Sequence, residues 1–165
     1  MNVNFLNPFI EAASEVIQSE LQTAVQRGSL KFQKSAFVTN DLAVLLNLIG
    51  QVQGIVLYEM STEMGLAIVS RVSGQAFDEL DELAQSGVAE FGNVITGRAT
   101  VKLAQAGFDT RISVPTLIQG KGAKISTFDF TRLIVPLQTE FGEVIIHLAL
   151  RARAESEQEI ERGAF

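Results

Sequence analysis

Residues 79–107, ELDELAQSGVAEFGNVITGRATVKLAQAG, predict a long helix that stops at Gly107. Each helical residue advances about 100° around the axis, so residues three or four positions apart share a face. One face is apolar and is expected to pack on the core; it carries Leu80, Ala84, Phe91, Val94 and Ile95. Another face is expected to meet solvent; it carries Ser86, Glu90, Asn93 and Gly97.

The solvent-facing stripe brings a carboxylate and a carboxamide together. Glu90 and Asn93 are three residues apart, and the small Ser86 and Gly97 beside them leave room for a partner. A carboxamide both donates and accepts hydrogen bonds, so Asn93 can hold a water molecule in line with a phosphorus atom without titrating. Glu90 is suited to engage a lysine or arginine of the partner. Solvated helix faces also carry such pairs by chance, so the spacing alone leaves both interpretations open.

Three glycines interrupt this helix. Gly87, Gly92 and Gly97 each cost about 1 kcal/mol relative to alanine, so each needs a structural reason. Close approach is the expected reason. Gly97 is predicted to open the polar stripe, whereas Gly87 and Gly92 are predicted to admit a neighbouring helix or strand.

The chain before the long helix predicts one further long helix, three strands and one short helix. Asn7-Pro8 has the pattern of a helix start and predicts a helix over residues 8–27 that Gly28 stops. Apolar and β-branched runs predict strands over residues 30–39, 42–49 and 54–60, with residues 50–54 as a connection. Ser61 is expected to cap the short helix, which runs through residue 70 and closes at Gly74.

The chain after the long helix predicts strands over residues 111–118, 125–137 and 143–151, the last two joined by a turn at residues 140–142. In the last strand one face is wholly apolar: Val144, Ile146, Leu148 and Leu150. Helices should cover that face. We therefore predict one α/β (α+β) domain, residues 1–153, with both long helices on one face of a mainly antiparallel sheet of about five or six strands. Residues 154–165 are predicted to be a charged, frayed tail.

Composition excludes several kinds of site. The chain has no cysteine and one histidine, His147, which excludes disulfides, thiolate nucleophiles and multi-histidine metal sites. The formal charge of -6 argues against nucleic acid or an anionic membrane as the partner. No signal peptide or apolar membrane span is recognisable, so a cytoplasmic location is expected.

Two other motifs are interpreted as structural. His147 lies between Ile146 and Leu148 on a predicted strand and has no evident carboxylate partner in the sequence, which favours a structural role over a general base. The stretch from Gly120 to Lys124 lacks the spacing of a phosphate-binding loop and precedes a strand, so we interpret it as a turn.

Several stretches of the chain resemble the CheX and CheC family of chemotaxis phosphatases. They are Asp81-Glu82-Leu83, Ser86, Glu90-Phe91-Gly92-Asn93, Thr96-Gly97, Val114-Pro115-Thr116 and the opening Asn7-Pro8-Phe9-Ile10. The resemblance runs from about residue 7 to residue 150 and implies removal of phosphate from a phosphorylated CheY-type response regulator. It implies that Asn93 positions the attacking water and that Glu90 contacts the regulator's lysine. Mg²⁺ and the phosphoaspartate would belong to the regulator, leaving this protein without a cofactor or metal of its own, and the family resemblance also implies a homodimer.

CheC-type proteins carry two such helices, and the single E-x-x-N helix here favours CheX. Glu15 and Gln18 on the first helix are the nearest approach to a second pair, and we interpret them as ordinary surface residues. Ile134, Val135 and Leu137, with the strand after Gly142, are candidates for an apolar dimer edge. A non-catalytic receiver-binding module and a plain dimerisation domain remain alternatives.

Overall fold

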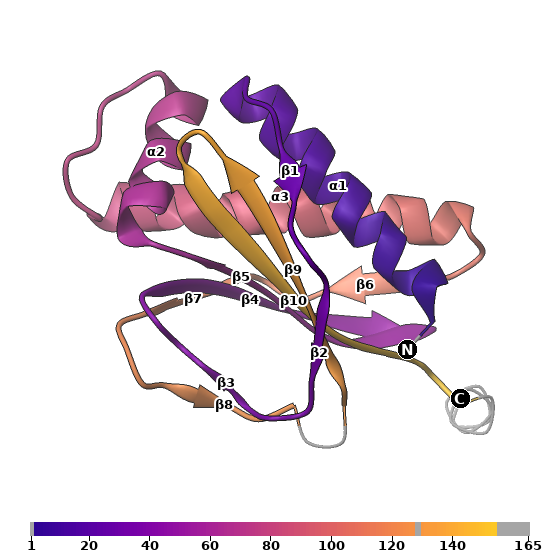
Figure 1. The fold of residues 1–165 in the computed structure, drawn as a ribbon. Coiled ribbons are helices and arrows are strands. Elements are labelled where there is room, and N and C mark those ends of the chain that lie inside the picture. The colour runs from indigo at the N-terminus through magenta and orange to yellow at the C-terminus, as the bar shows by residue number, and fades with distance from the viewer. Residues whose placement is uncertain (1, 128–129, 155–165) are drawn as a thin grey trace.

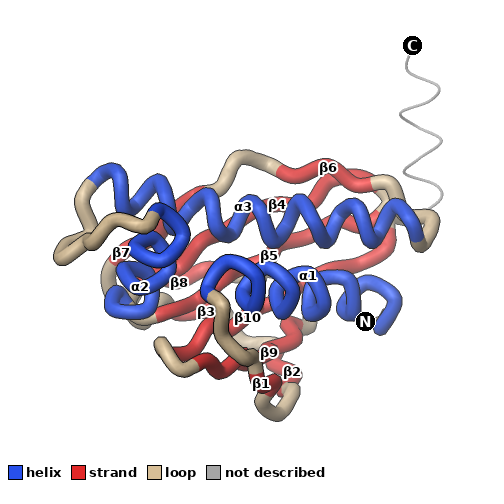
Figure 2. Tube along the Cα trace, turned by 90° about the horizontal axis from the view of Figure 1, so that it is seen from above, coloured by secondary structure: helices blue, strands red, loops and turns tan. Residues whose placement is uncertain are grey.

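Three helices cover one face of a mainly antiparallel sheet in the computed structural model, which describes residues 2–127 and 130–154 (Figures 1 and 2). The helices are α1 (Val3–Leu21), α2 (Thr62–Ser73) and α3 (Glu82–Gln105). Figure 2 shows α1 and α3 side by side over the strands. The predicted α+β fold class, with two long helices on one face, is confirmed.

The main sheet has the order β1-β9-β10-β5-β4-β6, with β2 also paired to β9 and β7 also paired to β4. Its strands are β1 (Gln26–Arg27), β2 (Lys31–Gln33), β4 (Leu42–Gly50), β5 (Val52–Met60), β6 (Thr110–Ile112), β7 (Thr116–Gln119), β9 (Arg132–Thr139) and β10 (Gly142–Ala152). A small second sheet pairs β3 (Phe37–Val38) with β8 (Lys124–Ile125). All pairs in both sheets are antiparallel.

The core lies between the three helices and the sheet. The apolar face of β10 is buried as predicted, because Val144, Ile146 and Leu148 are fully covered. Leu42 and Tyr58 of β4 and β5 are also fully buried beneath the helices. The opposite, outer face of the sheet carries a smaller apolar cluster under β3 and β8 that includes Phe37, Ala43 and Leu57.

The predicted bounds of the first helix were wrong. Helix α1 begins five residues before the predicted start, because Asn2 accepts a hydrogen bond from the Asn4 amide at 2.9 Å and Phe5 is buried. Pro8 therefore lies inside the helix and is itself buried. The helix ends at Leu21, whose carbonyl accepts a hydrogen bond from Arg71, so that the predicted last turn forms β1 instead.

Several predicted strands are divided differently in the structure. The predicted strand over residues 30–39 becomes β2 and β3 in two different sheets, and the predicted strand over residues 125–137 is divided between β8 and β9. The predicted strand over residues 111–118 is interrupted around Pro115, which has no amide hydrogen to donate. Strand β5 starts at the buried Val52, so most of the predicted connection belongs to the β4–β5 hairpin.

Helix starts and sheet edges also differ from expectation. Helix α3 starts at Glu82, three residues after the predicted start, because Asp81 caps it. Ser61 and Gly74 bound α2 as predicted.

The prediction of an apolar dimer edge at β9 was wrong. Strand β9 lies inside the sheet, between β10 on one side and β1 and β2 on the other. The predicted charged tail lies outside the described residues, apart from its first residue.

The glycines of α3 provide a test of how closely the helix packs. A Cβ at Gly92 would lie 2.8 Å from Cγ1 of the buried Val44, whereas a Cβ at Gly97 would meet nothing within 4 Å. Gly97→Ala is therefore expected to raise the free energy of unfolding by up to about 1 kcal/mol through helix propensity. Gly92→Ala is expected to lower it by about 1–3 kcal/mol through overpacking, despite the same gain in propensity. Urea unfolding of both variants measures the difference, and equal effects would contradict the described packing.

Candidate functional site

Helix α3 presents the polar stripe because its other side is held against the sheet. A Cβ at Gly87 would lie 2.7 Å from Val69 of α2, and a Cβ at Gly92 would lie 2.8 Å from Val44 of β4. These contacts confirm that both glycines admit a neighbouring element, as predicted. Gly97 lies in open space on the stripe, also as predicted.

A buried hydrogen-bond chain supports the same orientation of α3. Tyr58 on β5 lies 2.8 Å from the Thr96 hydroxyl, which itself donates to the Gly92 carbonyl at 2.8 Å. Because the Thr96 proton is used in that second bond, the Tyr58 hydroxyl is the donor in the first. Burial raises the pKa of Tyr58 above its usual range, so the phenol stays protonated as the donor. The chain joins the helix backbone beneath the stripe to the centre of the sheet.

The structure brings the predicted site residues together. Asn93 Nδ2 donates to Glu90 Oε2 at 3.5 Å, which is at the long limit for a hydrogen bond. Glu90 and Ser86 are exposed and Asn93 is half-buried. Because this one contact is weak, the carboxamide of Asn93 can exchange it for a water molecule or a partner atom.

The predicted core face of α3 was partly wrong. Val94 is 41% exposed, because it lies about 200° around the helix from Gly92 and Thr96, which face the sheet. Val88, which the prediction omitted, is buried instead.

Exposed apolar side chains lie along one side of the stripe. Leu83 is 62% exposed, Val94 41% and Val101 58%, and we call these three residues the apolar strip. Leu83 stands seven residues before Glu90, Val94 four residues after it and Val101 eleven residues after it. These spacings place all three on the same side of the helix as Glu90. The same spacing in the sequence could have identified the strip once the core side was known.

The possible second pair on α1 is occupied by an ion-pair network. Glu15 lies 2.8 Å from Lys102 Nζ and 3.4 Å from Arg98 of α3. The hydrogen bond from Lys102 is the main cause that lowers the pKa of Glu15, and it raises the pKa of Lys102. Glu15 is therefore engaged in joining α1 to α3, which supports the interpretation of Glu15 and Gln18 as surface residues.

His147 has a carboxylate partner that the sequence did not reveal. Its Nε2 lies 2.7 Å from Glu59 Oε2 on the neighbouring strand β5, and Arg132 Nε donates to its Nδ1 at 3.2 Å. Glu59 and His147 are far apart in sequence, but the antiparallel pairing of β5 with β10 brings them close together. This group lies on the outer face of the sheet, away from α3.

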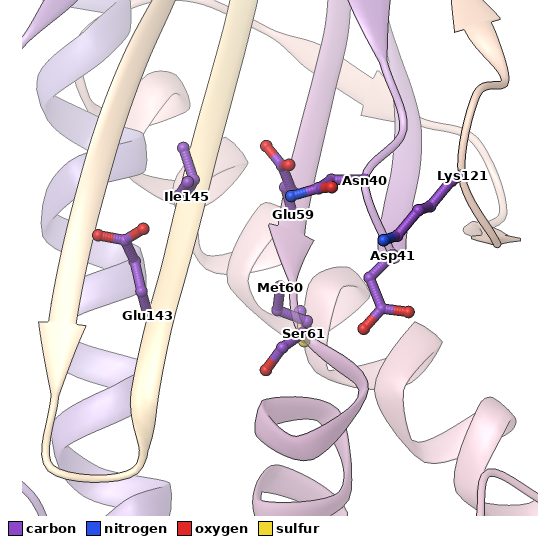
Figure 3. A pocket seen from close by; sticks show the side chains of 8 residues that line it. All are labelled: Asn40, Asp41, Glu59, Met60, Ser61, Lys121, Glu143 and Ile145. Carbon is purple, nitrogen blue, oxygen red and sulfur yellow. The ribbon is translucent and has the colours of Figure 1, made fainter.

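A concavity of about 460 Å³ also opens on the outer face (Figure 3). Its lining includes Asp41, Glu59, Lys121 and Glu143. The neighbouring turn does not bind phosphate through its backbone, because the amides of Gly120 and Gly122 already donate to the carbonyls of Asp41 and Thr39. Within the described residues no group of three or more acidic or histidine side chains is arranged to hold a metal ion.

Among the described helices, none combines the length and the apolar character needed to cross a membrane.

Comparison by sequence gives two matches. A family model described as chemotaxis phosphatase CheX matches residues 42–138, which include the whole of α3. The CheY-P phosphatase CheX of Thermotoga maritima is 29% identical over 129 residues, covering 78% of this chain and 83% of the relative.

Comparison by structure gives the same fold. A CheC-like superfamily protein from Shewanella sp. PV-4 has a TM-score of 0.82 at 24% identity, covering 92% of this chain and 100% of the other. The CheX-CheY-BeF3-Mg²⁺ complex from Borrelia burgdorferi includes a chain with a TM-score of 0.73 at 29% identity, covering 89% of this chain and 97% of the other.

Proposed function

This chain belongs to the CheX family of chemotaxis phosphatases, and we propose that it hydrolyses the aspartyl phosphate of a CheY-type receiver domain. The observation that carries the proposal is the pairing of Glu90 with Asn93 on the exposed stripe of α3, inside the region that the family model matches. The similarity to a CheY-P phosphatase and to a CheX-CheY complex supports a receiver as the partner. A receiver substrate also implies a cytoplasmic location.

Asn93 and Glu90 have different roles in the proposed reaction. Asn93 accepts one hydrogen bond from the attacking water and donates another within the site, which holds the water oxygen in line with the phosphorus–oxygen bond that breaks. Glu90 forms an ion pair with a lysine beside the receiver's phosphorylation site and orients the receiver. Ser86 and Gly97 leave space for the receiver surface to reach Asn93.

The receiver supplies the remaining chemistry. The phosphoaspartate is part of the receiver, and the receiver's Mg²⁺ neutralises the charge that develops on the phosphoryl oxygens. A solved complex that contains CheX, CheY, BeF3 and Mg²⁺ supports this division. The protein described here then needs no cofactor of its own, because it contributes a positioned water and a docking surface.

Asn93→Ala is expected to slow receiver dephosphorylation by about a hundredfold or more, since one oriented transition-state contact is lost. The measurement is the decay of a phosphorylated CheY-type receiver in Mg²⁺, with catalytic amounts of wild type or variant. Asn47→Ala is the matched control, because Asn47 is an exposed asparagine on β4. If wild type binds several receivers without accelerating decay, the protein is a non-catalytic receiver-binding module.

The apolar strip is proposed to contact the receiver beside the site. Burying Leu83 or Val101 against a partner contributes about 1 kcal/mol each, so Leu83→Ser and Val101→Ser should each raise KM roughly three- to tenfold. Both should leave kcat nearly unchanged, because neither side chain approaches the reacting atoms. Val38→Ser is the control: Val38 is 54% exposed but lies on β3, at the outer face. A fall in kcat without a change in KM would contradict a docking role.

We also propose that the protein forms a homodimer through the edge made by β1 and β2. Strand β2 pairs with β9 on one side, and Phe32 on β2 is 64% exposed. An exposed aromatic on an edge strand favours pairing with a second copy. Phe32→Glu should therefore shift the protein toward monomer in sedimentation equilibrium, whereas Val72→Glu on α2 should not. A monomeric wild type would contradict the proposal.

A further inference from the structure

Two buried side chains and one partly buried side chain form a continuous polar chain on the outer face of the sheet. Glu59, His147 and Arg132 come from the adjacent strands β5, β10 and β9. His147 is 5% exposed and Arg132 is 2% exposed, so both lie out of water. The chain runs from Glu59 Oε2 to His147 Nε2 over 2.7 Å, and from His147 Nδ1 to Arg132 Nε over 3.2 Å.

The geometry determines the protonation state of the imidazole. Arg132 Nε carries a hydrogen and can only donate, so His147 Nδ1 must be the unprotonated acceptor. His147 Nε2 then carries the ring hydrogen and donates it to the Glu59 carboxylate. In this state the imidazole is neutral and the three side chains together carry no net charge.

Arg132 also holds a segment of the chain against the sheet. We call residues 31–38, from β2 through β3, the arm. Arg132 Nη1 donates to the Ser35 carbonyl at 2.6 Å, and Arg132 Nη2 donates to Gln33 Oε1 at 3.1 Å. The Phe37 ring lies edge-on to His147, with 4.7 Å between the ring centroids. Arg132 thus attaches the arm in addition to the backbone pairs of β2 with β9 and of β3 with β8, and the same guanidinium group donates to His147.

We propose that Glu59, His147 and Arg132 form a proton-operated latch that holds the arm closed while His147 is neutral. A proton added at Nδ1 places two N–H donors opposite each other across 3.2 Å and adds a second positive charge beside Arg132. Glu59 can retain the imidazolium as an ion pair, so Arg132 is the group that must leave. When it leaves, the Ser35 carbonyl and the Gln33 side chain lose their partner, and the arm is left with its backbone pairs to β9 and β8 and the packing of Phe37. The arm then opens more often, because one of its attachments is gone.

Other charged groups around the latch favour the same direction. The concavity next to it, about 520 Å³, is lined by Lys124 of β8 as well as by Glu59, Arg132 and His147. Lys124 adds a positive charge that opposes an imidazolium in the closed state, whereas Glu59 is the acidic group that stabilises it in both states. The concavity also gives the Arg132 side chain space to move out of the closed position.

The sign of the pH dependence follows from the proton count. The closed arm binds one proton fewer than the open arm, so closing becomes more favourable as the pH rises and opening is favoured in acid. The chain contains one histidine, so a proton taken up by an imidazole is assigned to His147. Because the arm carries Phe32, the latch would make the proposed dimer edge sensitive to pH. The latch itself depends on neither the phosphatase nor the dimer proposal.

The test combines two measurements on the full-length protein between pH 8 and pH 5. The lone histidine gives an unambiguous NMR ring signal that reports protonation of His147. Hydrogen exchange of a peptide covering the arm reports opening, after correction for the intrinsic pH dependence of amide exchange. Protection of the arm should fall by up to about tenfold per pH unit as the pH is lowered toward the midpoint of the His147 transition and should level off below it, while protection of α1 stays constant.

Two variants separate the latch from general acid destabilisation. His147→Gln keeps a donor for Glu59 without titrating, so its arm protection should not change with pH. Glu59→Gln removes the charge that retains the imidazolium, so both transitions should move together to lower pH. The proposal is overturned if His147 titrates in wild type with no change in arm protection, if His147 takes up no proton in the folded protein, or if His147→Gln keeps the wild-type pH dependence. The first two outcomes are measured on wild type alone, so the test still decides the question if a variant folds poorly.

Discussion

The close packing of α3 against strands β4 and β5 is the constraint on which the rest of the structure depends. Gly92 has no side chain where a Cβ would overlap Val44, and the buried Tyr58–Thr96–Gly92 chain joins the helix backbone to β5 at the same level. Both contacts determine the rotation of α3 about its axis. Once that rotation is set, Glu90 must face outward, because it lies about 160° around the helix from Gly92, and Asn93 lies at the half-buried border of the exposed stripe.

The helix is used differently along its two sides. Toward α1, Arg98 and Lys102 engage Glu15 in ion pairs. These pairs lie at the surface and contribute little to stability, but they commit the acidic group of α1 to its neighbour. On the exposed stripe, Glu90 has no comparable cationic partner among the described residues. This asymmetry explains chemically why the pair on α3 is available to a partner and the pair on α1 is not.

The two faces of the sheet differ in chemical character. The inner face is apolar and carries α3, whereas the outer face buries charged groups, including Arg132 beside His147. Buried charges of this kind are costly unless they are paired, and removing one partner leaves the others uncompensated. They are therefore poor sources of stability, but each of them depends on its neighbours for its hydrogen bonds. The arm beside them is held by hydrogen bonds from Arg132 in addition to the backbone pairs of β2 with β9 and of β3 with β8.

The sequence alone determined the existence and type of most elements, the α+β class and the stripe with Glu90 and Asn93, because helical and strand periodicity are local properties. It also determined that Gly87, Gly92 and Gly97 needed close neighbours or open space. Only the tertiary structure decided that Gly87 meets α2 and Gly92 meets β4. It alone also showed that α1 starts before Pro8, that Val94 faces solvent and that β9 is internal to the sheet. Glu59 and His147 are 88 residues apart, and their contact was likewise decided by strand pairing. Such contacts depend on register between distant strands, which no local pattern of residues specifies.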